Sequence, residues 1–380
     1  MKILFVTNNI SVPGNGICTS VNTTVRHLRE RGIDARFLSG ISKDSGVPQP
    51  DFPLDRLYFP IFQPIIDANG FSYAKRNRRV IRQAVEWADI IHITEPLLLQ
   101  KDAIRMAEKI GKPIVGTFHL YTQNILTEIP LASWKWSNNL LMKNWMNAFF
   151  NHCSYIQCPT HAVRQLLEKH NCKSKLEVIS NGIAIPAEPV TASIPSANPY
   201  LILTTGRLCE VKKQMTLVEA MRHSRHSGEI QLYFAGNGVY RDKIIKACSK
   251  LVSEGILQYP PVIKFLTSAE LAELNRKAYL YVHCSKMEVE GLGCLEAIKE
   301  GAVPIIAQAE LVGTTDFALD GRSIFPTGDA KALADRIDWW IEHPREREMM
   351  GQEYADFSRN FDIGKSITSL IEMYKKALIR

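Results

Sequence analysis

Residues 280–307 read LYVHCSKMEVEGLGCLEAIKEGAVPIIA, and this stretch decides which fold we expect. Two short, mainly apolar runs, Leu280–His283 and Val303–Ala307, flank a segment of helical length, Gly293–Glu300. Mainly apolar strands joined by a helix are typical of a parallel sheet that helices cover on both faces. The stretch therefore predicts one strand–helix–strand unit of a doubly wound α/β domain.

The same alternation runs through most of the chain. Further short apolar runs predict strands at 3–7, 35–38, 90–93, 114–117, 155–158, 176–179, 201–205, 231–235 and 263–266. Periodic segments predict helices at 21–31, 161–169, 215–222, 241–252, 270–277, 330–342 and 363–378. The pattern breaks at Ile185–Tyr200, which contains four Pro and no periodicity. Such a segment is typical of a linker.

The break predicts two domains, residues 1–184 and 201–358, with a linker at 185–200. A closing helix at about 360–380 is expected to pack back on the first domain. The length of 380 residues agrees with two domains, because it exceeds what one ordinary core supports. Ligands of doubly wound sheets bind at the carboxyl ends of the strands, so we expect a cleft between two such edges.

The composition is that of a globular chain. Hydrophobic residues make up 46% and charged residues 22%, which argues against a largely disordered protein. No run of about 18 uncharged apolar residues predicts a transmembrane helix. The start, MKILFVTNNI, fits a buried strand better than a signal peptide. The eight Cys show no Cys-x-x-Cys pair and no zinc-site spacing, so we expect reduced core residues of a cytoplasmic protein with no metal.

Positive charge is concentrated in the first half of the chain. Residues 1–187 hold 22 Lys and Arg against 14 Asp and Glu, a balance of +8, whereas residues 188–380 hold 24 against 25, a balance of −1. The difference predicts that one domain faces something anionic, with chance and solubility as the alternative explanation.

The loop before the helix at 293–300 carries residues suited to a phosphorylated sugar. Gly291 and Gly293 allow a tight turn, and the helix that follows presents free N–H groups to an anion. Glu288 lies in the loop, where it can accept hydrogen bonds from sugar hydroxyls, and Glu296 lies about one turn inside the helix, within reach of a ribose diol. A solvated acidic loop is the alternative interpretation.

This stretch resembles the Glu-x7-Glu motif of the GT-B glycosyltransferases, especially the retaining enzymes of family 4. The resemblance implies two Rossmann-like domains that face a cleft, with Glu288 on the donor sugar and Glu296 on the ribose. Gly291, Leu292 and Gly293 would then complete the donor site.

A second resemblance concerns Gly206-Arg207-Leu208 with Lys212, which is similar to the pyrophosphate-binding Arg and Lys of that family. A leaving diphosphate needs fixed cations, and a site without a metal must supply them from side chains. The turn at Gly236 resembles a family Gly-x-Gly turn, although a plain strand–helix turn is equally compatible. The chain departs from the family where Lys213 replaces a Gly, where Leu266-Thr267 replaces a Gly-containing step, and where Ala184 replaces an Asp.

The resemblance places the acceptor in the first domain. It implies acceptor contacts at Gly14, Gly16 and Ile17, with Gly16 also near the donor phosphate. The Gly14–Gly16 loop is not a dinucleotide fingerprint, because Thr19 stands where a third Gly is needed.

His119 and Tyr121 follow the strand at 114–117, and the family has a His in its reaction centre at the position of His119. The resemblance therefore implies a catalytic His119 and an acceptor contact at Tyr121. His92 fits the more common case of a buried core histidine.

The acceptor is expected to be a lipid or a saccharide. The segment at 118–121 and the following Trp/Leu/Met-rich segment resemble the diacylglycerol glucosyltransferase branch. Trp134, Leu141, Trp145 and Phe149 share one predicted helical face, with Lys135 and Lys143 nearby, and the basic run Lys75–Arg79 adds charge. Such a helix suits an anionic membrane surface at the inner face of the membrane, but an amphipathic helix packed on its own core is equally compatible.

The sequence therefore predicts a hexosyltransferase that uses a nucleotide-diphosphate sugar, UDP in preference to GDP, without a cofactor. The catalytic group comprises His119, Arg207, Lys212 and Glu288, and closure of the hinge would bring the acceptor hydroxyl to the anomeric carbon. The absence of Asp-x-Asp argues against a metal-chelating donor site. The alternatives are a nucleotide-sugar hydrolase or epimerase on the same fold, and a degenerate subunit that binds without turnover. Binding to nucleic acid is not expected, because the basic residues do not interleave with aromatics.

Overall fold

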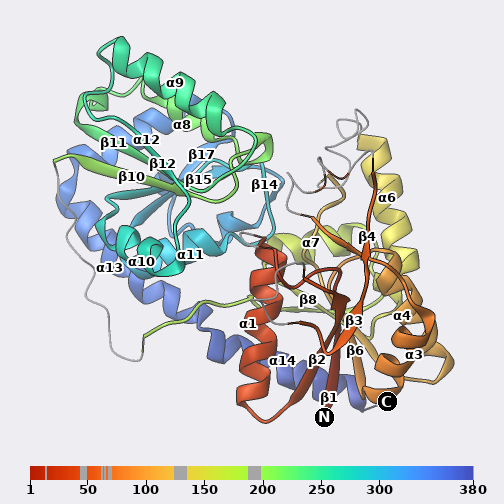
Figure 1. The fold of residues 1–380 in the computed structure, drawn as a ribbon. Coiled ribbons are helices and arrows are strands. Elements are labelled where there is room, and N and C mark those ends of the chain that lie inside the picture. Colours follow the sequence, from red (N-terminus) through yellow and green to blue (C-terminus); the bar gives the residue numbers. More distant parts are fainter. Residues whose placement is uncertain are drawn as a thin grey trace. The chain divides into compact units, whose positions relative to one another are not determined.

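The computed structural model describes residues 1–12, 15–42, 49–60, 63, 66, 71–123, 135–186 and 198–379. The chain divides into two compact units, drawn in Figure 1. Unit 1 consists of Met1–Asn181 together with Gly364–Arg380, and unit 2 consists of Gly182–Ile363. The chain thus passes from one unit to the other twice. Most of the predicted linker, residues 187–197, lies outside the described residues.

Unit 1 is built on a parallel sheet of seven strands. Their order across the sheet is β3-β2-β1-β6-β7-β8-β9. The strands are β1 (Lys2–Val6), β2 (Asp34–Gly40), β3 (Phe52–Leu54), β6 (Ile90–Ile93), β7 (Ile114–Thr117), β8 (Tyr155–Cys158) and β9 (Lys175–Val178). The helices are α1 (Gly16–Glu30), α3 (Arg78–Trp87), α4 (Leu98–Lys109), α6 (Lys135–Ala148), α7 (His161–Lys169) and α14 (Ile363–Leu378). A small antiparallel pair, β4 (Arg56–Leu57) and β5 (Tyr73–Ala74), lies outside this sheet.

Unit 2 repeats the plan with six parallel strands in the order β12-β11-β10-β13-β15-β17. They are β10 (Tyr200–Thr205), β11 (Ile230–Ala235), β12 (Val262–Lys264), β13 (Leu280–His283), β15 (Val303–Gln308) and β17 (Ile324–Pro326). The helices are α8 (Gln214–Ala220), α9 (Arg241–Ser253), α10 (Ser268–Lys277), α11 (Leu292–Lys299), α12 (Ala330–Glu342) and α13 (Pro344–Ser358). In both units the order reverses beside the first strand, which is the switch point where doubly wound sheets bind ligands. The predicted α/β class with two doubly wound domains is confirmed.

Two local differences from the sequence prediction have simple causes. β12 ends at Lys264 rather than at Leu266, because Thr267 and Glu270 form a capping box that begins α10. The prediction omitted α13, whose inward side includes Arg347. The Arg347 guanidinium donates to backbone carbonyls of Ala278, Tyr279 and Gly301. Because this inward-facing residue is charged, the apolar pattern that predicts a helix is interrupted there.

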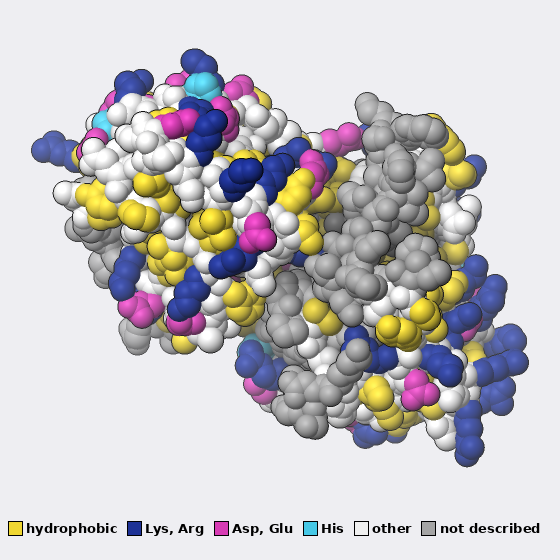
Figure 2. All heavy atoms as spheres, turned by 45° about the horizontal axis from the view of Figure 1, so that its top comes forward, with side chains coloured by type: hydrophobic (Ala, Val, Ile, Leu, Met, Phe, Trp, Pro, Cys, Tyr) yellow, Lys and Arg dark blue, Asp and Glu magenta, His cyan; other side chains and the backbone are white. Residues whose placement is uncertain are grey.

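Helix α6 has one buried face and one face exposed to solvent. Trp145 and Phe149 are buried, so their face packs on the core of unit 1 and cannot anchor the chain to a membrane. Trp134 lies outside the described residues. The exposed apolar residues of α6 are Trp136 and Leu140, at 59% and 60% exposure. Figure 2 shows Lys and Arg side chains gathered along one edge of unit 1, on the side of α3 and α4. No helix in the described part of the chain is long and apolar enough to span a bilayer.

A directed chain of hydrogen bonds crosses the core of unit 1. Gln157 Nε2 donates to the carbonyl of Ile179 at 3.0 Å, so its Oε1 accepts the hydroxyl proton of Thr117 at 2.7 Å. Thr117 has no second proton and must accept from His92 Nε2 at 2.7 Å, which leaves His92 Nδ1 to accept from the Tyr374 hydroxyl at 2.6 Å. His92 is therefore a neutral core histidine, as predicted, and ties α14 to three strands.

The position of His92 makes unit 1 sensitive to acid. Burial lowers the pKa of His92 from 6.5 to about 3, so between these values the unfolded chain binds a proton that the folded chain does not. The contribution of His92 to stability is complete above the upper value and is lost as the pH falls toward the lower one. The slope of the unfolding free energy for one such proton is about 1.4 kcal/mol per pH unit.

We expect His92→Gln, which can still donate to Thr117 and accept from Tyr374, to reduce the pH slope of the unfolding free energy by about that amount. Urea denaturation across this pH range measures the slope, and an unchanged slope would contradict the assignment.

Candidate functional site

An ion pair between two distant segments lies at the centre of the predicted donor site in unit 2. Lys212 ends a short 3-10 turn that follows β10, and its Nζ donates to Oε2 of Glu288 on the two-residue strand β14 (Met287–Glu288). The side chains are 21% and 20% exposed. The Lys286 amide also donates to the carbonyl of Val211 at 3.0 Å, which joins the two segments through the backbone. The fold thus brings together the predicted phosphate-binding cation and the predicted sugar-binding carboxylate.

The charge of this pair is set by its surroundings. Burial is the largest single effect on the pKa of Glu288 and acts to raise it, but the charge and hydrogen bond of Lys212, together with His283 and Arg207, outweigh burial and bring the pKa below its ordinary value. His283, at the end of β13, places Nε2 3.6 Å from Glu288 Oε2 and 3.3 Å from Thr314 Oγ1. Burial lowers the pKa of His283 to about 4, so the imidazole is neutral at neutral pH. Sequence reasoning missed His283, although a histidine that ends a strand just before the Glu288 loop was a usable signal.

Glu296 differs from Glu288 in forming no ion pair with the residues that the structure describes. It lies on α11, burial raises its pKa, and its carboxylate accepts no hydrogen bond from the described residues. Burial raises the pKa of Tyr281 well above its ordinary value, and the charges of Glu288 and Glu296 add to this shift. Both carboxylates therefore act on the Tyr281 hydroxyl, which lies 2.8 Å from Thr205 Oγ1. The charges of the motif thus act on a part-buried pair of hydroxyls.

The glycines of this loop are required by close packing. Gly291 has φ +87°, and a side chain there would meet Thr314 Oγ1 at 2.5 Å. A side chain at Gly293 would overlap Thr205 Oγ1 and approach the Tyr281 hydroxyl to 3.2 Å. The glycines let α11 begin directly over the Thr205–Tyr281 pair.

The amino end of α11 is open to an anion. Its N-cap is Gly291, which has no side chain to bond the free amides. Within the described residues the N–H groups of Leu292 and Gly293 find no acceptor. A helix end with free N–H groups is a favourable place for a phosphate.

The loop that carries Arg207 rests on a second pair of glycines. A side chain at Gly236 would overlap the carbonyl oxygen of Gly206, and the Leu208 amide donates to the carbonyl of Asn237 at 2.9 Å. Gln214, 2% exposed, donates from Nε2 to the carbonyl of Arg207 at 2.9 Å. Gly236 thus supports the loop through backbone packing, and its contact with a donor stays a prediction. Gln214 is a supporting residue that the sequence analysis did not find.

The amino end of α1 in unit 1 is arranged differently. The Asn15 side chain accepts from the amides of Ile17 and Cys18, at 2.9 and 3.2 Å. The Ile17 amide is therefore already bonded within the chain, and the predicted acceptor contact at Ile17 stays a prediction. Gly16, the first residue of α1, has no atom within 4 Å of where a side chain would begin, and Gly14 lies outside the described residues.

His119 and Tyr121 follow β7 as predicted. His119 is half-buried, and burial lowers its pKa to about 4, so it is neutral at neutral pH. Tyr121 is buried, with its ring 5.5 Å from that of Phe118. Tyr121 thus packs in the core of unit 1, and its acceptor contact stays a prediction, as does the catalytic role of His119.

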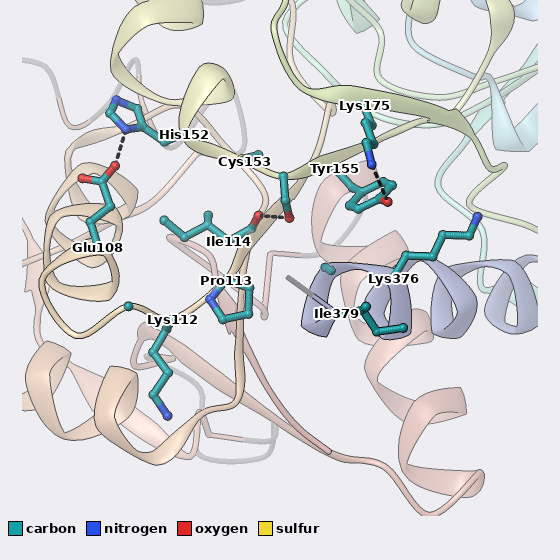
Figure 3. Close-up of a pocket in the computed structure, with 13 residues that line it drawn as sticks. Glu108, Lys112, Pro113, Ile114, His152, Cys153, Tyr155, Lys175, Lys376 and Ile379 are labelled. Atoms are coloured by element: carbon teal, nitrogen blue, oxygen red, sulfur yellow. Dashed lines mark hydrogen bonds and ion pairs between the residues drawn. The ribbon is translucent and has the colours of Figure 1, made fainter.

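A cavity of about 490 Å³ in unit 1 contains none of the predicted site residues. It lies at the amino ends of β7, β8 and β9, opposite the edge where such sheets bind ligands. Figure 3 shows that Lys112 and Lys376 point away from each other, and their Nζ atoms bond the Ala88 carbonyl and Glu177. The basic side chains therefore do not converge on a common ligand.

Comparison with known proteins agrees with this geometry. Residues 14–185 match the model described as Glycosyltransferase Family 4, and residues 191–356 match the model described as Glycosyl transferases group 1. The chain is a GT-B glycosyltransferase of group 1. An alpha-monoglucosyldiacylglycerol synthase of Streptococcus pneumoniae is 22% identical over 81% of this chain and 71% of its own. The sulfoquinovosyl transferase SQD2 of Arabidopsis thaliana is 21% identical over 93% of this chain and 69% of its own. The structure of Anabaena HepE, solved with UDP, covers 99% of this chain and 100% of its own at 18% identity and a TM-score of 0.72, which shows the shared fold.

One departure of this glycosyltransferase from its family has a structural explanation. Lys213 stands where the family usually has Gly, and it adopts the left-handed conformation, with φ 51° and ψ 28°. Its Nζ donates to Glu210 Oε1 at 2.6 Å, and Lys286 pairs with the other oxygen of Glu210 at 2.6 Å. The backbone expected of a glycine is thus kept, at a cost of about 1–2 kcal/mol for a residue with a side chain.

The conformation of Lys213 can be tested by substitution. Lys213→Gly relieves the left-handed strain but increases the entropy of the unfolded chain, so we expect the unfolding free energy to change by less than about 1 kcal/mol. Lys213→Val keeps the strain, adds a β-branched side chain and loses the ion pair, so we expect a loss of about 1–2 kcal/mol. Urea denaturation of both variants decides the matter, and equal stability of the Val and Gly variants would contradict the assigned conformation.

Proposed function

We propose that this glycosyltransferase moves a hexose from a nucleotide-diphosphate sugar, UDP in preference to GDP, to a lipid or glycan acceptor. We further propose that the reaction retains the anomeric configuration and needs no metal ion. The observation that carries the proposal is the Lys212–Glu288 pair beside the open end of α11. The carboxylate of Glu296, which accepts no hydrogen bond from the described residues, lies one turn inside the helix. The names of the glycolipid-forming relatives and the UDP complex of HepE support the choice of donor and acceptor.

Binding of the donor would replace the bond between Lys212 and Glu288 with bonds from each side chain to the donor. The diphosphate would accept hydrogen bonds from the amides of Leu292 and Gly293 and from Arg207 and Lys212. Once Lys212 bonds a phosphate oxygen, Glu288 loses its cation and can accept the hydroxyl protons of the sugar. Glu296, which has no partner to give up within the described residues, would accept from the ribose diol.

The chemical step would then depend on charge stabilisation. The bond between the anomeric carbon and the phosphate oxygen breaks, and the acceptor oxygen bonds the same face of that carbon. The leaving phosphate takes the proton of the acceptor hydroxyl, so no protein nucleophile is needed. Lys212 and Arg207 stabilise the negative charge that develops on the diphosphate, an effect that fixed cations provide best in a partly buried site.

Activity of variants tests this assignment. We expect Lys212→Ala to lower kcat by about 10²–10³-fold, the loss seen when one fixed donor to a developing charge is removed. Glu288→Gln should lower kcat/KM, and Glu296→Gln should mainly raise the KM for the donor. Release of nucleotide diphosphate from a panel of UDP- and GDP-sugars measures these effects.

The neighbouring lysine supplies the matched control. Lys213→Gly should keep wild-type turnover, since Lys213 pairs with Glu210 and not with Glu288. If Lys212→Ala and Glu288→Gln retained full turnover, the donor site would lie elsewhere. Product analysis by NMR tests retention, and addition of a chelator tests metal independence.

A peripheral position on an anionic membrane is part of the proposal. Lys75, Arg76, Arg78, Arg79 and Arg82 are all exposed around the start of α3. They give the edge of unit 1 in Figure 2 a strong positive charge, and α6 exposes Trp136 and Leu140 in the same unit. Basic side chains together with exposed aromatic and aliphatic groups suit a surface that touches lipid head groups.

Vesicle binding tests this position. Each basic residue near an anionic surface contributes about 1 kcal/mol, so Arg78→Gln with Arg79→Gln should weaken binding to phosphatidylserine-containing vesicles by about thirtyfold. Lys331→Gln with Arg345→Gln, two exposed cations of unit 2, is the control and should bind as the wild type does. Equal binding of the two double variants, or no loss with added salt, would argue against a membrane role for this edge.

A further inference from the structure

A small cavity with both polar and apolar lining lies in unit 1 at the carboxyl ends of β1 and β6. Asn8, Asn9, Asn15 and Glu95 are among its lining residues, with apolar side chains that include Ile17. The space open to the centre of a water-sized group is about 20 Å³, enough for one such group. The cavity lies at the sheet edge where doubly wound folds bind ligands.

Among the described residues, the groups that bond the buried carboxylate of Glu95 are all neutral. Its Oε2 accepts from the backbone amide and the Nδ2 of Asn8, at 3.1 and 3.2 Å, and from Gln100 Nε2 at 2.6 Å. Its Oε1 accepts from the Thr7 hydroxyl at 3.2 Å, while the nearby Thr94 hydroxyl donates to the carbonyl of Val6. Burial raises the pKa of Glu95, although the hydrogen bonds oppose the shift. A carboxylate 8% exposed, with no cation to pair it, is costly for folding alone and calls for a second reason.

The bonds of Glu95 also leave it capacity for a ligand. A carboxylate accepts about four hydrogen bonds, two at each oxygen. Three donors reach Oε2, whereas in the described part of the chain Oε1 is bonded by the Thr7 hydroxyl alone, which also lies 3.3 Å from the Asn9 carbonyl. The carboxylate is held in place by its own network and still presents one accepting position.

Asn9 supplies the opposite chemistry. It is 7% exposed, and its Oδ1 accepts from the amide and hydroxyl of Ser11, at 2.6 and 3.1 Å. These bonds fix the amide so that Nδ2 is the remaining end, and its protons find no acceptor in the described part of the chain. Because Asn9 lines the cavity, an acceptor bound there can take a hydrogen bond from Nδ2.

The pair of groups selects one kind of ligand atom. A hydroxyl donates to Glu95 and accepts from Asn9 at the same time. An ammonium group accepts nothing and would leave Asn9 unbonded, and a phosphate or carboxylate would meet the charge of Glu95. A bound water has the same donor and acceptor properties as a hydroxyl, so the experiment must separate the two.

We propose that this cavity is the subsite for a hydroxyl group of an uncharged acceptor, held between Glu95 and Asn9. This inference rests on the proposed function, since it names the acceptor class that unit 1 takes. It adds Glu95 and Asn9 as specificity-determining residues and selects neutral polyols, such as a diacylglycerol or a sugar, over phosphorylated compounds. The basic edge would then attract the anionic membrane, while the cavity takes the uncharged lipid from it.

Conservative variants separate this role from a structural one. Glu95→Gln keeps an oxygen toward Asn8 and Gln100 and turns its new amide toward Thr7, whose hydroxyl can rotate to accept. Asn9→Asp keeps the bonds from Ser11 and removes the N–H donor. With dioctanoylglycerol or octyl glucoside as acceptor, we expect either variant to raise the acceptor KM by about tenfold or more, with less than about twofold change in the donor KM. Preference for these neutral acceptors over dioctanoyl phosphatidylglycerol should fall in Glu95→Gln.

The control is another buried carboxylate. Asp338 in unit 2 accepts from Ser224 Oγ at 2.5 Å and from the Arg225 amide at 3.0 Å, and it lies outside both proposed sites. Asp338→Asn should lower the melting temperature without moving the acceptor KM. A merely structural role for Glu95 would make Glu95→Gln behave in the same way, with loss of stability and no split between the two KM values.

Direct binding distinguishes failure of this inference from failure of the proposed function. Calorimetry of octyl glucoside with the full chain, in the absence of donor, should show binding that weakens about tenfold in both Glu95→Gln and Asn9→Asp. If the wild type binds in this way but turns over no sugar nucleotide, the proposed function is wrong and the subsite stands. If the wild type transfers sugar while both variants keep its acceptor KM and its binding, the cavity holds only water and the subsite is wrong. Absence of both transfer and binding would overturn both.

Discussion

The ion pair between Lys212 and Glu288 joins segments that lie 76 residues apart and sets the geometry of the predicted donor site. Each side chain is about one-fifth exposed, so neither charge could remain in place alone. Removing one partner of this half-buried pair leaves the other charge uncompensated, which is unfavourable. A ligand that displaces the carboxylate from Lys212 must therefore offer an anion to the lysine and donors to the glutamate. A phosphorylated sugar offers both in one molecule, whereas free phosphate or free sugar offers only one.

The two helices that begin at glycine-containing loops show how the chain divides its chemistry. In unit 2, α11 begins at Gly291 with no side-chain cap, so its first amides stay available to a phosphate. In unit 1, the Asn15 side chain already bonds the first amides of α1. The first N–H groups of the helix are thus available to a ligand in unit 2, whereas Asn15 already bonds them in unit 1. The interior of unit 1 offers the carboxylate of Glu95 instead, which disfavours anions. The contrast supports a division in which unit 2 takes the charged donor and unit 1 takes an uncharged partner.

Sequence reasoning reached the parts of the structure that depend on short segments. The strand–helix alternation predicted the central strands closely, and the motif residues Arg207, Lys212, Glu288 and Glu296 lie on one edge of one sheet, since each follows a strand of unit 2. Sequence reasoning failed where the residue that determines the role of a side chain is distant in the sequence. Glu95 reads as an ordinary acidic residue after a strand, because its partner Asn8 is 87 residues away. The face of α6 was uncertain for a related reason: its apolar residues lie on more than one side, and only packing decides that Trp145 is inside and Trp136 outside.

The residues that depart from the family pattern lie in turns and at a helix start, and the local backbone accommodates each change. Lys213 adopts the left-handed conformation that the missing glycine would have supplied, and Thr267 replaces a glycine-containing step with the capping box of α10. At Ala184, where the family has Asp, the backbone carbonyl still accepts from Lys299 at 3.4 Å. None of these changes removes a side chain that faces Lys212, Glu288 or Glu296. A degenerate site would lose the charged groups first, because an unpaired buried charge is costly once its ligand no longer selects for it. The chain keeps those charges and varies its turns, which is the pattern of a working enzyme.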